Sequence, residues 1–314
     1  MQQQPLAGFL LVLTAVCMWG ALPIALQQVV AVMDAQTIVW YRFITSAIGL
    51  FILLGLRKTL PKPTALRQRY LILIMLGILG LSANSFLFNL ALNYIPPTSS
   101  QVLSPLSSFI MLFVGVFVFK EQIGLHQKIG LVILILGLVL FFNQRFSDFL
   151  QLNDYFKGIV IALCASSCWV AYGMAQKLML NRFSSQQILL MIYIGCTIIF
   201  TPIANIQQVS ALNSFQLGCL IFCCLNTIIA YGTYGEALNR WDISKVSAIM
   251  TQIPIFTIIF TEILIAVYPQ FFVDQELNWI SYLGAITVVS GSLLSVLGHK
   301  LPAIFHRKNH QVSL

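Results

Sequence analysis

Residues 15–19 read Ala-Val-Cys-Met-Trp, and residues 165–169 read Ala-Ser-Ser-Cys-Trp. Each stretch follows a glycine at the same spacing, Gly8 in the first case and Gly158 in the second. Two parts of the chain, one at its start and one near its middle, therefore begin with the same pattern.

The correspondence continues to the end of both parts. Residues 91–93 and residues 237–239 both read Ala-Leu-Asn. The last apolar run of each half carries two glycines seven residues apart, which are Gly130 and Gly137 in the first half and Gly284 and Gly291 in the second. We therefore predict a duplicated chain, with repeats at residues 1–143 and 158–298, a linker at 144–157 and a cytoplasmic tail at 299–314.

The composition is that of a membrane protein. Of the 314 residues, 59% are hydrophobic and 8% are charged, and the mean hydropathy is +0.89, whereas soluble domains carry roughly 25% charged residues. A helix needs about 20 apolar residues to cross a bilayer. Ten runs meet or approach that length, at residues 6–32, 35–56, 70–92, 98–119, 127–142, 158–180, 187–202, 215–238, 243–267 and 279–297.

Five of these runs fall in each half of the chain. Because an odd number of crossings reverses polarity, the second half has to insert upside down relative to the first, which is the inverted-repeat plan of many secondary transporters. The predicted fold class is an all-α integral membrane protein with ten transmembrane helices in two inverted five-helix repeats.

Lysine and arginine are concentrated in alternate loops, as expected of loops that face the cytoplasm. The basic loops and tail contain Arg57, Lys58, Lys62, Arg67, Arg69, Lys120, Lys128, Lys177, Arg182, Arg240, Lys245, Lys300, Arg307 and Lys308, whereas the other loops contain Arg145 and Lys157. Both termini are predicted to be cytoplasmic, and the first run is interpreted as a retained span. This asymmetry accounts for the formal charge of +8, so nucleic acid is not an expected partner.

All seven cysteines fall in predicted spans, where cysteine packs as a small apolar residue. Cys219 and Cys223 share a helix face and are a conceivable metal pair, but no histidine or carboxylate is close in sequence. We expect no disulfide, no metal site and no cofactor.

Three ionisable residues lie within predicted spans, where each costs about 2.5 to 3.5 kcal/mol to insert. Arg42 either contacts an anionic group of a substrate or a buried carboxylate, or it snorkels to the interface or pins two helices. Glu236 precedes Arg240 by one turn, the favourable order for an ion pair. Glu262 has no basic residue one turn away and is the candidate for proton coupling, with a wet structural position near the surface as the alternative.

Prolines are expected to interrupt three of the spans, because a proline within a helix leaves the carbonyl four residues earlier without its usual donor. Pro23, Pro105 and Pro254 would free the carbonyls of Trp19, Gln101 and Met250, respectively. Interrupted helices bind substrate or form hinges in many transporters, although simple kinks are also common. These prolines are the candidate hinges or helix breaks.

Uncharged polar and aromatic side chains gather in and around the same spans. Such residues also hydrogen-bond helices to one another, but together they suit an amphipathic organic molecule. The candidates for lining a substrate cavity are Trp19, Arg42, Asn84, Phe88, Ser104, Ser108, Trp169, Tyr172, Tyr231, Tyr234, Thr251 and Gln252. The glycines of the fifth and tenth runs predict instead a close helix contact, within a monomer or across a homodimer.

Several short motifs add a family resemblance to this pattern. They are Trp19-Gly20, Tyr41-Arg42-Phe43, Lys120-Glu121, the glycine-rich fifth and tenth runs, and Glu276 shortly before the last run. In the order of these motifs and in its duplication, the chain resembles over nearly its whole length the EamA-like branch of the drug/metabolite transporter superfamily. One departure is Ser108, which replaces a proline usual in the fourth span, with Pro105 one turn earlier.

The resemblance implies a ten-span carrier of the inner membrane, with a central cavity lined by spans one, three, four, six, eight and nine. Such carriers move small metabolites, often outward, and their substrates include amino acids and amino-acid derivatives. The sequence contains no Walker-type phosphate-binding motif, so we expect facilitative or ion-coupled transport.

We therefore expect a secondary transporter that exports a small amphipathic metabolite by alternating access of two inverted halves. One alternative is an intramembrane enzyme, which would need a nucleophile with a base at membrane depth; the histidines, His126, His299, His306 and His310, all fall in loops or the tail. The other alternative is a non-transporting sensor or scaffold, which would normally add a soluble domain or a longer tail than residues 299–314.

Overall fold

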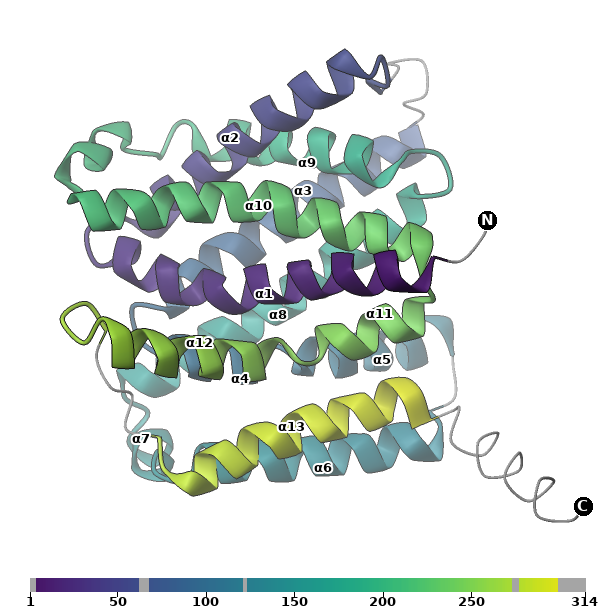
Figure 1. Cartoon of the computed structure of the whole chain (residues 1–314). Coiled ribbons are helices and arrows are strands. Elements are labelled where there is room, and N and C mark those ends of the chain that lie inside the picture. Colours follow the sequence, from purple (N-terminus) through teal and green to yellow (C-terminus); the bar gives the residue numbers. More distant parts are fainter. Residues whose placement is uncertain (1–3, 62–67, 121–122, 273–276, 299–314) are drawn as a thin grey trace, which may run out of the picture.

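The computed structural model describes residues 4–61, 68–120, 123–272 and 277–298 of the chain. Within these ranges the protein is all-helical and contains no strand (Figure 1). Several features of the sequence lie outside them, namely Lys62 and Arg67 of the basic loops, Glu121, Glu276 and the tail at 299–314. The helices are α1 (Pro5–Val30), α2 (Ala35–Leu56), α3 (Gln68–Ala91), α4 (Pro97–Val102), α5 (Leu106–Phe119), α6 (Leu125–Phe141), α7 (Phe146–Gln151), α8 (Asp154–Met179), α9 (Ser185–Phe200), α10 (Ser214–Arg240), α11 (Ile243–Met250), α12 (Ile253–Val267) and α13 (Trp279–Leu297), and a 3-10 helix covers Ile206–Ala211.

Seven stretches of the described residues are long and apolar enough to cross a membrane. Six are the single helices α1, α2, α3, α8, α10 and α13, and the seventh, Lys245–Val267, joins α11 to α12. The other predicted runs correspond to the shorter apolar helices α6 and α9 and to the pair α4 and α5. Polar residues begin several of these helices by accepting hydrogen bonds from first-turn N–H groups, as Asp34 does from Thr37 at 2.8 Å and Asn278 from Ser281 at 2.8 Å.

Two of the predicted spans are interrupted in the middle. The fourth divides between α4 and α5, where Pro105 follows the end of α4, and the ninth divides between α11 and α12, where Pro254 lies in the first turn of α12. A proline in the first turn costs no hydrogen bond, because that N–H has no partner within the helix. Pro23 differs, since α1 continues through it from Pro5 to Val30. The predicted break at Pro23 is therefore corrected to a proline within an uninterrupted helix.

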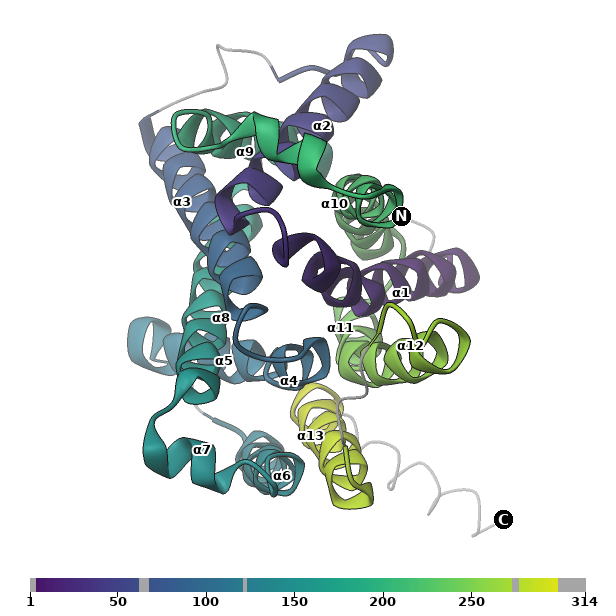
Figure 2. The same ribbon diagram turned by 90° about the vertical axis from the view of Figure 1, so that its left-hand side faces the viewer.

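The helices pack in pairs that relate the two halves of the chain (Figure 2). Helix α1 packs against α10, and α8 packs against α3; α1 also packs against α12, and α8 against α5. Helix α2 contacts α10 as α9 contacts α3. The remaining large contacts, α2 with α9 and α6 with α13, each join corresponding helices of the two halves.

The glycines spaced seven apart form the contact between α6 and α13. A Cβ added to Gly291 would lie 2.6 Å from the carbonyl oxygen of Gly130 and from the amide nitrogen of Leu134, and one added to Gly137 would meet Gly284 and Val288. The absence of side chains lets the two backbones touch. The sequence left open whether this contact lies within one molecule or between two copies, and the structure places it within one molecule.

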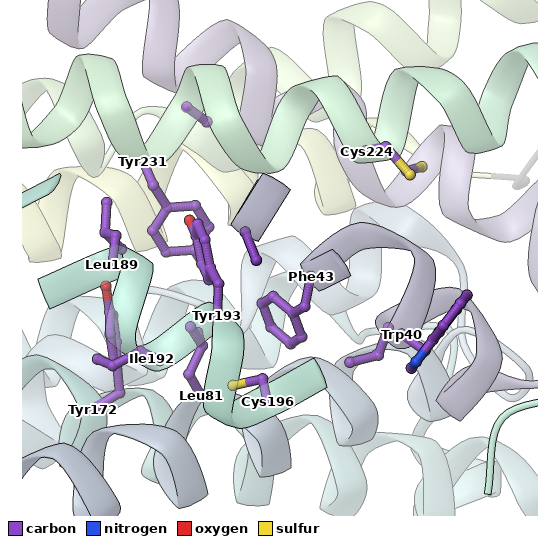
Figure 3. Close-up of a cluster of buried hydrophobic side chains, with 14 of the residues drawn as sticks. Trp40, Phe43, Leu81, Tyr172, Leu189, Ile192, Tyr193, Cys196, Cys224 and Tyr231 are labelled. Atoms are coloured by element: carbon purple, nitrogen blue, oxygen red, sulfur yellow. The ribbon is translucent and has the colours of Figure 1, made fainter. Parts of the chain in front are cut away.

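A large buried cluster is formed by residues of α1, α2, α3, α8, α9 and α10 (Figure 3). The rings of Phe43 and Tyr193 stack there with centroids 5.5 Å apart. Tyr193 meets Tyr231 edge-on at 6.1 Å, and Tyr231 meets Tyr172 at 6.3 Å. Tyr231 therefore belongs both to this cluster and to the centre of the molecule.

Candidate functional site: a central cavity

A cavity of about 270 Å³ lies at the centre of the helices, close to the lower end of the range of roughly 300–1,000 Å³ usual for small-molecule sites. Its walls come from α1, α2, α3, α8, α10 and α13 and from the two interrupted spans. Of the residues selected from the sequence, the cavity is lined by Trp19, Arg42, Asn84, Phe88, Ser104, Pro105, Ser108, Trp169, Tyr231, Tyr234 and Thr251. That these side chains bind a substrate remains a prediction.

The other selected residues lie elsewhere. Tyr172 is 1% exposed and sits behind the wall, its ring 5.2 Å from that of Trp169. Gln252 is half-buried at the start of α12 and does not line the cavity. Pro23 and Pro254 are buried in helix packing, also outside the lining.

The lining also includes Ser85, Ser100, Gln101 and Ser107, which belong to the polar groups that the sequence places in the third and fourth spans. Sequence reasoning missed the rest of the lining, which is Leu22, Ala162, Ala165, Ser166, Ser247, Met250, Ile253 and Val296. A signal for some of these existed. Ala162, Ala165, Ser166 and Trp169 follow the spacing of one helix face, so the position of Trp169 would have identified the small residues beside it. Val296 carries no such signal, because only the packing of α13 brings it to the cavity.

One wall of the cavity is aromatic. The ring of Trp19 lies 6.0 Å from Trp169, 5.2 Å from Tyr231 and 5.5 Å from Tyr234. The first two contacts are edge-on, the geometry that the quadrupoles of aromatic rings favour. Rings held in this way form a rigid surface against which the apolar part of a molecule can pack.

Side-chain amides join the helices around the cavity. Asn84 Nδ2 donates to the carbonyl oxygen of Ala165 at 2.8 Å and ties α3 to α8. Three successive carbonyls of α1 accept from three other helices, those of Met18 from Asn226, Trp19 from Gln101 and Gly20 from Thr257. This stretch of α1 is thereby fixed to α4, α10 and α12.

Arg42 is the charged residue of the cavity lining. Its side chain is 4% exposed, so it does not snorkel to a surface. Its Nε donates to Thr227 Oγ1 at 3.0 Å. The structure thus keeps open the interpretation in which Arg42 meets an anionic group of a substrate.

The two glutamates within the spans lie outside the cavity. Glu236 Oε1 accepts from Arg240 Nε at 2.8 Å, which is the ion pair predicted from their spacing. Glu262 is exposed and accepts from the hydroxyl of Tyr282 at 2.6 Å, a contact that joins α12 to α13. The structure therefore does not bring the proton-coupling candidate to the substrate candidates.

Interrupted helices and a buried polar lining between two packed halves are typical of membrane transport proteins. A family model described as the EamA-like transporter family matches the chain twice, at residues 6–143 and 156–297. The chain belongs to this family.

Relatives of similar length carry transporter names. The chain is 54% identical to an uncharacterized transporter of Haemophilus influenzae over 99% of this chain and 100% of that protein. It is 44% identical to the uncharacterized inner membrane transporter YhbE of Escherichia coli, over 96% of this chain and 94% of that protein. A probable amino-acid metabolite efflux pump of Escherichia coli is 20% identical over 68% and 72% of the two chains. A solved crystal structure of another protein, 17% identical, matches 94% of this chain and 98% of that one with a TM-score of 0.64, which shows the same fold.

Proposed function

We propose that the protein is a secondary transporter of the inner membrane that moves a small amphipathic metabolite, such as an amino acid or a derivative, by alternating access. The observation that carries this proposal is the central cavity, which lies where both interrupted spans meet the aromatic wall. Interrupted helices at the interface of two repeats are where transporters of inverted-repeat architecture bind their substrates.

The inverted ten-span layout is part of the proposal. It is supported by the two matches of the family model and by the packing pairs, since exchanging the halves turns the contact of α1 with α10 into that of α8 with α3. Helices α6 and α9, with 17 and 16 residues, are short for a span of about 20 residues. Both pack against long helices of the other half, and a thinner local bilayer accommodates such lengths at modest cost.

We infer that the cavity opens toward the end of the molecule that carries the basic loops, which is the predicted cytoplasmic side. Three observations support this. The first half-helix of the fourth span, α4, packs against α12, the second half-helix of the ninth. The other two half-helices, α5 and α11, pack against different neighbours: α5 packs against α8, while α11 packs against α1 and α13. Ser247 and Val296, near the basic ends of α11 and α13, line the cavity.

The inner membrane and the outward direction are supported by relatives, through the names inner membrane transporter and amino-acid metabolite efflux pump. A cavity open to the cytoplasm is the state in which an exporter loads. Cytoplasmic termini follow from the basic loops. The alternatives, an intramembrane enzyme and a non-transporting sensor or scaffold, have no comparable support from a named relative.

The test is counterflow in liposomes. Purified protein is reconstituted with a pool of unlabelled amino acids and derivatives inside, and uptake of each labelled compound is measured with and without a pH gradient. Ser104→Trp, which fills the cavity, is expected to stop exchange. Ser167→Trp, on an exposed face of α8, is the matched control and is expected to preserve it. Exchange that persists in Ser104→Trp would contradict a route through this cavity.

A further inference from the structure

We propose that Arg42 is an anion anchor in the central cavity and that the transported molecule places a carboxylate on it. This inference rests on the proposed transport function and adds the chemical class of the substrate. Arg42 is a buried positive charge that has no counter-charge among the residues that the structure describes.

No carboxylate of the described residues pairs with Arg42. The ion pairs among the described residues join Arg145 to Asp148, Arg240 to Glu236 and Lys245 to Asp242. The cavity lining includes no aspartate or glutamate among the residues that the structure describes. A buried charge without a partner is strongly unfavourable in a membrane protein, and one that is kept there usually serves a function.

The hydrogen bonds of Arg42 leave the outer end of its side chain available. A guanidinium has five N–H donors, and the structure engages Nε, with Thr227 Oγ1 as the acceptor at 3.0 Å. Among the described residues, Nη1 and Nη2 have no hydrogen-bond acceptor. These two nitrogens form the planar fork that binds a carboxylate through two parallel hydrogen bonds.

The titratable groups of the described residues that feel the charge of Arg42 are neutral. They are the phenols of Tyr193 and Tyr231 and the thiols of Cys223 and Cys224. Phenols and thiols are uncharged near neutral pH, and none of them supplies the missing negative charge. The remaining source of an anion is a molecule that enters the cavity.

The rest of the lining indicates an organic acid rather than an inorganic anion. Arg42 and Tyr231 line the same cavity, and the ring of Tyr231 lies 5.2 Å from that of Trp19, so a molecule with its carboxylate on Arg42 has the aromatic wall available for its organic part. The hydroxyls of Ser85, Ser100 and Ser104 can bind neutral polar groups. Because the described lining offers no carboxylate to an ammonium group, the carboxylate is the required charge of the substrate and an ammonium is dispensable.

A structural role for Arg42 predicts a different response to substitution. An arginine that pins α2 to α10 would leave the protein less stable when replaced. If Arg42 is an anion anchor, its unpaired buried charge destabilises the protein when no substrate is bound. Arg42→Met is then expected to keep or raise the melting temperature. The Thr227 hydroxyl keeps a hydrogen-bond partner in this variant, since it also donates to the carbonyl oxygen of Cys223 at 3.0 Å.

The experiment compares two probes that each lack one charge of leucine. N-acetyl-L-leucine keeps the carboxylate and lacks the ammonium, and L-leucinamide keeps the ammonium and lacks the carboxylate. Binding is measured from the shift in melting temperature of the full-length protein in detergent. N-acetyl-L-leucine is expected to stabilise the wild type and L-leucinamide is not. Arg42→Met should weaken the apparent affinity for N-acetyl-L-leucine roughly 10- to 100-fold, the usual loss for charge-assisted hydrogen bonds, and Arg42→Lys should restore part of it.

Two outcomes would overturn the inference. One is stabilisation by L-leucinamide that persists in Arg42→Met. The other is a melting temperature that falls in Arg42→Met together with no response of the wild type to either probe. Counterflow separates these from a failure of the proposed function: a wild type that exchanges leucinamide but not N-acetyl-leucine is still a transporter, with a different substrate class.

Discussion

The side-chain amide of Gln101 donates a hydrogen bond to the carbonyl oxygen of Trp19 at 3.1 Å. That carbonyl is the one that Pro23, four residues later, leaves without its usual donor inside α1. In hydrocarbon a free carbonyl needs a new partner, and a residue of the first interrupted span provides it. The same hydrogen bond therefore satisfies the free carbonyl of α1 and attaches α1 to α4 beside the cavity.

A double-mutant cycle tests this relationship. Gln101→Leu is expected to lower the free energy of unfolding by about 1–3 kcal/mol, the cost of a buried acceptor left unpaired. Pro23→Ala returns an N–H to α1, so in that background Gln101→Leu should cost clearly less. Thermal unfolding in detergent gives the four values. Ser100→Ala removes a neighbouring hydroxyl that has no hydrogen-bond partner among the described residues, so it is the control and should change little. Additive costs would contradict the assignment.

The contact between α6 and α13 predicts a sharp difference between two glycines. Gly291→Ala places a methyl group 2.6 Å from the backbone of Gly130 and Leu134, which cannot rotate away, and we expect a loss of at least about 1–3 kcal/mol. Gly218→Ala in α10 is the control, since a Cβ there has no atom within 4 Å. Equal melting temperatures of the two variants would show that α6 and α13 do not meet as closely as described.

The bounds of the helices could be predicted from the apolar runs, because a run that must cross hydrocarbon ends where polar residues begin. Residues 35–56 and 279–297 were predicted as spans, and α2 and α13 cover the same residues. The interruptions near Pro105 and Pro254 could be placed as well, since proline acts on its own helix. Pro23 shows the limit, because a neighbouring helix supplies what the proline removes.

The rotation of each helix about its axis was harder to predict, and the errors in the predicted cavity lining follow from it. Trp169 and Tyr172 are less than one turn apart on α8, yet Trp169 lines the cavity and Tyr172 packs behind it against Tyr231. Glu262 lies on the exposed side of α12, where it bonds Tyr282. A membrane helix that is apolar all round carries no pattern that tells a lipid-facing side from a protein-facing side. The neighbouring helices determine which side of a helix is buried, and for α8 these include α3 and α5 from the other half of the chain.

The proposed access from the cytoplasm can be measured with cysteine labelling. In a variant without the seven native cysteines, Ser247→Cys should react with a membrane-impermeant maleimide in inside-out vesicles and not in intact cells, because Ser247 lines the cavity near the basic end of α11. Gln207 is exposed beside Gln208, which hydrogen-bonds Asp34 between α1 and α2, at the end of α1 away from its start. Gln207→Cys should therefore react in intact cells only. Labelling of Ser247→Cys in intact cells would contradict the proposed opening.

Glu262 is proposed to carry a coupling proton. Glu262→Gln should abolish transport driven by a pH gradient and leave substrate exchange at equal pH intact, since Glu262 does not line the cavity. Tyr282→Phe removes the hydroxyl that donates to Glu262 at 2.6 Å but keeps the carboxylate, so it should retain transport driven by a pH gradient. Both variants are compared with the wild type in the same liposomes. An unchanged pH dependence in Glu262→Gln would leave the pair with the role that its contacts support directly, which is to hold α12 against α13.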